Sequence, residues 1–269
     1  MLHVLVVAAA VAASPLVSTD WLQAHLNDPQ VRIIYVGDTD TYKRAHIPGA
    51  RLLDHMETVR MGGNGHRLAP TDVLLRAFTH AGAADEAHVV LYGDSPMATG
   101  WVYMALVSIG HGDSVSWLDG GVRLWEMEKR PVSTSTPEPG IGPLSARPGP
   151  ETIVDAAWVR SRLDSPATKI LDVRTKQEWT NGHLPNATLV LWQDLFADQQ
   201  TLKFKSPDEI RALFARAGVQ PNQEVVTYCA VGMRASLMYW AARSAGIPAR
   251  VYVGSWQDWS ADATNPIAK

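Results

Sequence analysis

The stretch His46-Ile47-Pro48-Gly49-Ala50 recurs 137 residues later as His183-Leu184-Pro185-Asn186-Ala187. A short run rich in β-branched residues precedes each copy, at residues 31–36 and 169–173. Such runs are typical of parallel strands that are buried on both faces. Because the same two features return in the same order, we interpret the chain as a tandem duplication of one fold.

The remainder of each copy follows the same order. Apolar runs at residues 87–92 and 224–228 lead through a loop into apolar helical segments at residues 100–109 and 235–245. Residues typical of helix N-termini, such as Ser206-Pro207-Asp208-Glu209, agree with the predicted order of strands and helices. Alternating short strands and helices in both halves predict two α/β domains, each a mostly parallel sheet flanked by helices.

The two copies are separated by a stretch that favours neither helix nor strand. Residues 131–150 contain six prolines, which interrupt both helices and central strands, so we predict a surface linker there. The predicted organisation is an apolar leader at residues 1–13, a first domain at 14–130, and a second domain at 151–269.

Residues 1–13 are almost wholly apolar and end in small residues. They resemble the hydrophobic part and cleavage zone of a secretory signal, although no Lys or Arg precedes them. The segment is too short for a membrane-spanning helix, which needs about 20 apolar residues. We favour an exported, periplasmic protein slightly over a cytoplasmic one. The alternative is an extra buried strand or helix on the first domain.

Composition narrows the functional classes. The 269 residues are 46% hydrophobic and 19% charged with a net charge of −3, as in an ordinary globular protein. The charges are scattered, which argues against nucleic acid or a membrane surface as partner. The single cysteine excludes an intramolecular disulfide and leaves a Cys/His zinc cluster without its usual ligands. We expect no metal or cofactor, and we favour a monomer.

That cysteine, Cys229, directly follows the predicted strand at 224–228. Active sites of open parallel sheets lie beyond the carboxyl ends of the strands. The loop turns at Gly232, so that the amides of residues 230–234 and the positive end of the next helix would surround the sulfur. Arg234 adds a permanent positive charge. We predict a thiol that ionises at neutral pH and acts as a nucleophile, rather than a buried structural cysteine.

The loop Cys229-Ala230-Val231-Gly232-Met233-Arg234 resembles the active-site loop of rhodanese-like sulfurtransferases. A second block, Asp172-Val173-Arg174 followed by Glu178-Trp179 and Gly182-His183-Leu184-Pro185, is similar to another motif of that family. Closing motifs at residues 118–125 and 252–259 complete the resemblance, which runs from about Pro15 to the C-terminus. It implies two tandem rhodanese-like domains.

Comparison of the two copies indicates which one is active. The first copy lacks the nucleophile, the loop cation and the Asp-x-Arg pair. Their places are taken by Tyr92 or Gly93 opposite Cys229, Ala98 opposite Arg234, and Tyr35 and Gly37 opposite Asp172 and Arg174. The first domain therefore resembles the inactive N-terminal domain of two-domain sulfurtransferases, which forms one wall of the cleft.

The resemblance implies a sulfurtransferase. Cys229 would take the sulfane sulfur of thiosulfate as a persulfide and pass it to cyanide or a thiol, in a ping-pong reaction without a cofactor. Asp172 and Glu178 are predicted as structural residues near the site, and a bond of Arg174 to either carboxylate is the alternative for that residue. The residues predicted to hold the anionic donor are Arg234, Arg174, Ala230, Val231, Gly232 and Met233.

Thiosulfate is favoured as the donor, and 3-mercaptopyruvate is the alternative. The mercaptopyruvate branch places a serine two residues after the cysteine, in a relay with a histidine and a carboxylate, and here Val231 stands at that position. His66 resembles the relay histidine and is predicted as a cleft residue. Met56 stands where the relay carboxylate would align.

Two further classes stay open. A phosphatase of the same fold would carry a Cys-x5-Arg loop, one residue longer than the Cys-x4-Arg loop from Cys229 to Arg234. A non-catalytic rhodanese module would carry or sense sulfur without turnover, and such modules commonly lack the cysteine that this chain retains.

Overall fold

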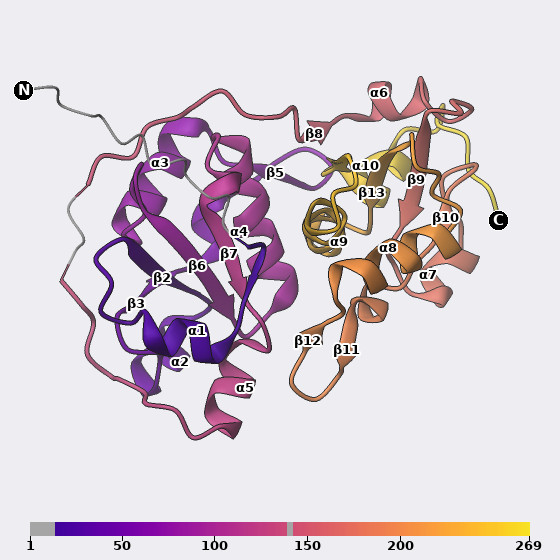
Figure 1. The fold of residues 1–269 in the computed structure, drawn as a ribbon. Coiled ribbons are helices and arrows are strands. Elements are labelled where there is room, and N and C mark those ends of the chain that lie inside the picture. The colour runs from indigo at the N-terminus through magenta and orange to yellow at the C-terminus, as the bar shows by residue number, and fades with distance from the viewer. Residues whose placement is uncertain (1–13, 139–141) are drawn as a thin grey trace, which may run out of the picture.

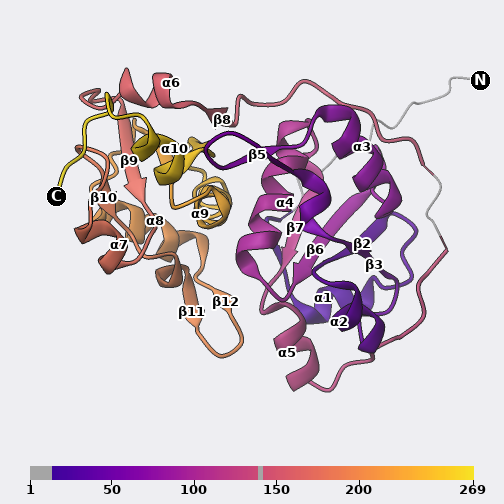
Figure 2. The same ribbon diagram turned by 180° about the vertical axis from the view of Figure 1, so that it is seen from behind.

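The structure, a computed structural model, describes residues 14–138 and 142–269. The leader predicted at residues 1–13 lies outside the described residues. Two α/β bodies, each built on a five-stranded parallel sheet, lie side by side (Figure 1; seen from behind in Figure 2). No helix in the described ranges is long and apolar enough to cross a membrane.

The first sheet has the strand order β1-β7-β6-β2-β3, and its paired strands are parallel. Its strands are β1 (Leu16–Val17), β2 (Val31–Val36), β3 (Ala50–Leu53), β6 (His88–Gly93) and β7 (Val115–Leu118). The helices of this half are α1 (Thr19–Ala24), α2 (Thr39–Arg44), α3 (Thr71–His80), α4 (Pro96–Ser108) and α5 (Gly121–Met127), with short 3₁₀ turns η1 (His55–Thr58) and η2 (Gly112–Ser114). A hairpin of β4 (Val59–Met61) and β5 (His66–Leu68) stands apart from the sheet.

The second sheet repeats this plan with the order β10-β9-β13-β14-β8. Its strands are β8 (Ile153–Val154), β9 (Thr168–Asp172), β10 (Thr188–Leu189), β13 (Glu224–Tyr228) and β14 (Ala249–Tyr252). The other elements are α6 (Ala156–Arg160), α7 (Lys176–Thr180), η3 (Trp192–Leu195), α8 (Pro207–Arg216), α9 (Met233–Ser244), α10 (Ser255–Ala261) and a hairpin of β11 (Phe196–Asp198) and β12 (Lys203–Phe204).

Alternate residues of the central strands point to opposite faces, so each sheet is covered on both sides. In the first half, α1, α2 and α5 cover one face and α3 and α4 the other. In the second half, α6 and α10 cover the outer face and α8 and α9 the inner one. The inner cores of the two halves form one continuous apolar cluster, joined where α4 packs against α9.

Contact between α4 and α9 is close because Gly100 has no side chain. A Cβ atom at Gly100 would lie 2.7 Å from the Cα of Leu237. Each half also sends its hairpin to the other half. Arg67 of β5 pairs with Asp258 of α10 at 3.1 Å, and the Phe204 amide of β12 donates to Asp119 at 2.9 Å. Both views show the β4–β5 hairpin beside α10 (Figures 1 and 2).

Candidate active site

Cys229 lies at the carboxyl end of β13, between β9 and β14 in the sheet, where the topology of a parallel sheet places an active site. Cys229 is only 1% exposed to solvent. The Gly232 amide donates a hydrogen bond to the Cys229 Sγ at 3.1 Å. Gly232 has a φ of +96°, a left-handed conformation that favours glycine. The loop therefore turns one backbone donor back onto the sulfur.

Helix α9 begins at Met233 directly after this turn, and no side chain caps its N-terminus. In the first half, by contrast, Ser95 accepts a hydrogen bond from the Ala98 amide at 3.3 Å and caps α4. The first amides of a helix lack partners within the helix and carry a partial positive charge. In the second half these donors remain available to an anion at Cys229.

Arg234, in the first turn of α9, forms a two-fold ion pair with Glu178 of α7. Its two terminal nitrogens donate to the two carboxylate oxygens, each at 2.7 Å. Hydrogen bonding to Arg234 lowers the pKa of Glu178 to about 2, against the opposing effect of burial. The pKa of Arg234 is raised by Glu178 and, further, by attraction to Cys229. The loop cation predicted from the sequence is thus beside the sulfur and shared with Glu178.

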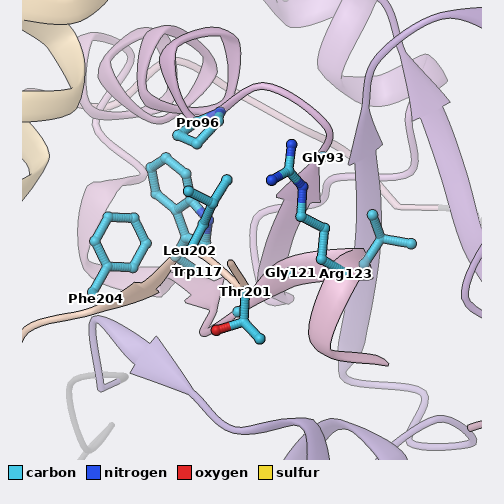
Figure 3. A pocket seen from close by; sticks show the side chains of 10 residues that line it. Gly93, Pro96, Trp117, Gly121, Arg123, Thr201, Leu202 and Phe204 are labelled. Carbon is cyan, nitrogen blue, oxygen red and sulfur yellow. The ribbon is translucent and has the colours of Figure 1, made fainter. Parts of the chain in front are cut away.

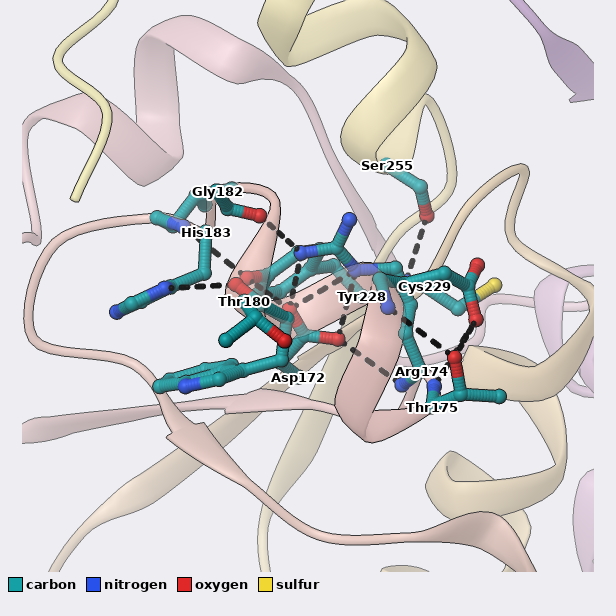
Figure 4. Close-up of polar contacts among 12 residues, drawn as sticks. Asp172, Arg174, Thr175, Thr180, Gly182, His183, Tyr228, Cys229 and Ser255 are labelled. Carbon is teal, nitrogen blue, oxygen red and sulfur yellow. Dashed lines mark hydrogen bonds and ion pairs between the residues drawn. The ribbon is translucent and has the colours of Figure 1, made fainter. Parts of the chain in front are cut away.

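Asp172 and Arg174 form a buried pair below the loop (Figure 4). Arg174 is 2% exposed, and its Nε and Nη2 donate to the Asp172 carboxylate at distances of 2.6 to 3.0 Å. Nη2 also donates to the Gly182 carbonyl at 2.7 Å, and the guanidinium stacks on Trp256 at 4.5 Å. Tyr228 donates its hydroxyl to Asp172 at 2.5 Å.

This geometry does not fit the predicted role of Arg174 in donor binding. Its charge is matched by Asp172, and its side chain is enclosed by protein, an arrangement that favours a structural role. The bond to Asp172, which the sequence left as the alternative, is the one that the structure contains. Asp172 and Glu178 were predicted as structural residues near the site, and each carboxylate holds an arginine, Arg174 and Arg234 respectively.

Ser255, a residue for which the sequence predicted no role, lies against the cysteine. Its Oγ accepts a hydrogen bond from the Cys229 amide at 3.1 Å and donates to the Tyr252 carbonyl at 2.8 Å. The next residue, Trp256, donates its amide to the Cys229 carbonyl at 2.9 Å. Ser255 has a φ of +56°, and Gly121 has a φ of +52° in the matching motif of the first half. The closing motif was the sequence signal for this contact.

His66, the predicted cleft residue, stands at the start of β5 in the first half. Its ring meets Trp101 edge-on with centroids 6.0 Å apart. Burial, and then the charge of His55, lower the pKa of His66. Its Nδ1 is buried without a hydrogen-bond partner among the described residues. Asp54 contacts His55 instead, at 3.5 Å, and Met56 is exposed. His66 therefore has no relay carboxylate in the part of the chain that the structure describes.

The first half carries a closed version of the same site. The Tyr92 hydroxyl accepts the Ile47 amide at 3.0 Å, as that of Tyr228 accepts the Leu184 amide at 3.1 Å. The residue after Tyr92, Gly93, therefore corresponds to Cys229. A Cβ atom there would lie only 2.2 Å from the Val36 carbonyl oxygen.

The cavity beside Gly93, shown in Figure 3, measures about 20 Å³. That is close to the space that one water molecule needs. It lies between Pro96 of α4, Arg123 of α5 and the β11–β12 hairpin, from which Thr201, Leu202 and Phe204 line it. The cavity of the first half is therefore too small for a sulfur donor.

Comparison with known proteins identifies the protein family of this chain. The model of the rhodanese-like domain matches residues 18–128 and 155–262. The chain belongs to the rhodanese-like family. Crystal structures agree in fold. YnjE superposes with a TM-score of 0.82 at 26% identity, over 95% of this chain and 68% of that one. SseA from Escherichia coli, described as a rhodanese fold, gives 0.79 at 24% identity, over 91% and 99%.

Related proteins of similar length indicate the type of reaction within this family. A thiosulfate sulfurtransferase of Azotobacter vinelandii is 28% identical over 91% of this chain and 94% of its own length. A probable 3-mercaptopyruvate sulfurtransferase of Pseudomonas aeruginosa is 27% identical over 96% and 99%. The sulfur carrier protein TtuD of Thermus thermophilus is 29% identical over 94% and 96%. The chain is a two-domain sulfurtransferase, and the predictions of fold and of reaction class are confirmed.

Proposed function

We propose that this sulfurtransferase takes its sulfur from thiosulfate and that Cys229 carries it. The observation that supports this most directly is the hydrogen bond from the Gly232 amide to the Cys229 Sγ, at the uncapped N-terminus of α9. A thiolate is the species that attacks sulfur, and backbone donors with a nearby guanidinium stabilise it. The amide and Arg234 lie in the same loop and helix start as Cys229.

The proposed reaction has two displacements. The Cys229 thiolate attacks the outer sulfur of thiosulfate, the sulfur–sulfur bond of the donor breaks, and sulfite leaves with the bonding electron pair. The persulfide then gives its outer sulfur to cyanide or to a thiolate, and the electrons return to Cys229 as thiolate. Thiocyanate or a new persulfide is the product. No oxidant or reductant is consumed.

The loop residues Ala230, Val231, Gly232 and Met233 contribute backbone amides to the anionic donor and the persulfide in this scheme. Arg234 contributes charge. Since Glu178 already holds both of its terminal nitrogens, the donor must share the guanidinium with that carboxylate. A compact dianion competes for it better than a monoanion, because the attraction grows with charge.

Two features support thiosulfate over 3-mercaptopyruvate. Val231 has no hydroxyl for a relay, and His66 contacts no carboxylate among the described residues. A proton relay for a carbonyl-bearing donor is therefore incomplete. Relatives of both names match the chain at similar identity, so similarity does not separate the donors.

The test is a donor comparison. Wild type and Cys229→Ser are assayed with thiosulfate and with 3-mercaptopyruvate, with cyanide as acceptor. We expect a higher kcat/KM for thiosulfate and loss of transfer in Cys229→Ser. A higher kcat/KM for 3-mercaptopyruvate would overturn the donor assignment alone. Persulfide formation without turnover on cyanide or thiols would identify a sulfur carrier, and turnover of p-nitrophenyl phosphate would identify a phosphatase.

A further inference from the structure

Trp101 belongs to α4 of the first half and is fully buried. Its indole lies against Gly232, in the catalytic loop of the second half. A Cβ atom on Gly232 would stand 3.2 Å from Cζ3 of Trp101 and 2.8 Å from the Val253 carbonyl oxygen. The Gly232 backbone is thus held between an indole of one half and a carbonyl of the other.

Gly232 is also the residue whose amide donates to the Cys229 sulfur. A hydrogen bond to sulfur depends on the direction of the N–H group, which the conformation at Gly232 sets. Its left-handed φ of +96° is one of several that glycine adopts freely, so the residue itself does not fix the turn. Contact with Trp101 restricts that freedom from one side.

The Trp101 indole is itself held in place by residues of the first half. The close crossing of helices at Gly100 brings the neighbouring Trp101 to the domain boundary. Its Nε1 is directed to the Thr58 carbonyl oxygen at 3.5 Å, and the His66 ring meets it edge-on. Both of these partners belong to the first half. Trp101 therefore links the position of the first half to the conformation of the loop that surrounds Cys229.

We propose that Trp101 is a positioning residue for sulfur transfer, acting through Gly232 to keep the loop amide directed at the thiolate and the persulfide. The inference rests on the proposed role of Cys229 as nucleophile. It gives the first half a part in the chemistry although its own site is closed. If Trp101 has this role, its substitution changes the reactivity of the Cys229 sulfur as well as the stability of the protein.

The experiment compares Trp101→Leu and the milder Trp101→Phe with Trp125→Phe. Trp125 is a matched control because it is a fully buried tryptophan of the same half, packed on the opposite face of the sheet. Alkylation of Cys229 by iodoacetamide is followed against pH, together with melting temperature and steady-state kinetics with thiosulfate. Alkylation needs no sulfur donor, so it reads the loop independently of whether the proposed reaction is right.

In Trp101→Leu the rate of alkylation at neutral pH should fall by roughly tenfold, because the hydrogen bond from the Gly232 amide to the sulfur is weakened. We expect kcat/KM to fall in proportion, with a smaller change in Trp101→Phe. Trp125→Phe should lower only the melting temperature. An unchanged alkylation profile in both Trp101 variants would overturn the inference. Sulfur transfer that survived in Cys229→Ser would instead overturn the proposed function and leave the alkylation result standing.

Discussion

Cys229 and Gly93 follow equivalent tyrosines in the two halves, yet only one position admits a side chain. The difference lies in the neighbouring backbone, because the Val36 carbonyl oxygen stands where a Cβ of residue 93 would be. Ser95 then uses its side chain to cap α4, whereas the matching helix α9 is uncapped. The first half therefore differs from the second at several residues of this loop and not by the missing thiol alone.

The Glu178–Arg234 pair predicts a pH-dependent stability difference. The folded-state pKa of Glu178, about 2, lies below its ordinary value of 4.5, so its contribution is complete above pH 4.5 and is lost as the pH falls toward 2. For this partly exposed pair we expect about 1 kcal/mol at pH 7. Urea unfolding of wild type and Glu178→Gln should show this gap at pH 7 and a narrower one at pH 3. A gap that widened on acidification would contradict the assignment.

Ser255 offers a second prediction about a single residue. Removing its hydroxyl in Ser255→Ala leaves the buried Cys229 amide without a partner and should cost about 1–3 kcal/mol of unfolding free energy. Ser255→Gly loses the same bond but relieves the left-handed φ, so it should be less destabilised. Chemical denaturation of both variants checks the order. Equal or reversed losses would show that the backbone conformation carries no strain.

At the scale of elements, Arg174 joins the end of β9 to the segment after α7 through Asp172 and the Gly182 carbonyl. The sequence placed this arginine shortly after a strand, which β9 confirms, but spacing does not reveal the direction in which a long side chain folds. The Cys229 loop was easier to predict because its strand, glycine turn and helix are contiguous. Ser255 and Trp101 reach the loop from distant elements, so only tertiary structure reveals them.

A pair of substitutions separates the roles of the two arginines. Arg174→Met leaves the buried Asp172 carboxylate without its cationic partner, which should cost about 3–5 kcal/mol of unfolding free energy. Its KM for thiosulfate should remain close to that of wild type in the folded protein. Arg234→Met should lose about 1 kcal/mol or less and most of its activity with thiosulfate. Denaturation curves and kinetics measured on both variants check this, and a large rise in KM for folded Arg174→Met would restore its role in donor binding.

At the scale of the whole molecule, the two halves cover each other. Each sends a hairpin to the closing motif of the other, and α4 and α9 share one core. The repeat in the sequence predicted two similar domains and their order along the chain. The repeat did not predict how the two halves pack against each other. Those contacts depend on individual residues such as Gly100 and Leu237, which no sequence pattern links.

Gly100→Ala tests the packing of the halves. In an exposed helix this substitution stabilises by about 1 kcal/mol, because alanine favours the helix. Here the new methyl group would lie 2.7 Å from the backbone of Leu237, so we expect destabilisation and lower activity. Gly62→Ala, at a hairpin tip with no atom within 4 Å, is the control and should change little. A more stable Gly100→Ala protein would mean that the helices do not meet so closely.

A sulfur atom carried by Cys229 would be detectable as added mass on the protein. Wild type and Cys229→Ser are incubated with thiosulfate, freed of excess donor, and examined by mass spectrometry before and after addition of cyanide. We expect one added sulfur atom on the wild-type peptide containing Cys229, released by cyanide as thiocyanate, and no addition to Cys229→Ser. Continued transfer by Cys229→Ser, or wild-type turnover without a modified Cys229, would contradict the role of Cys229 as sulfur carrier.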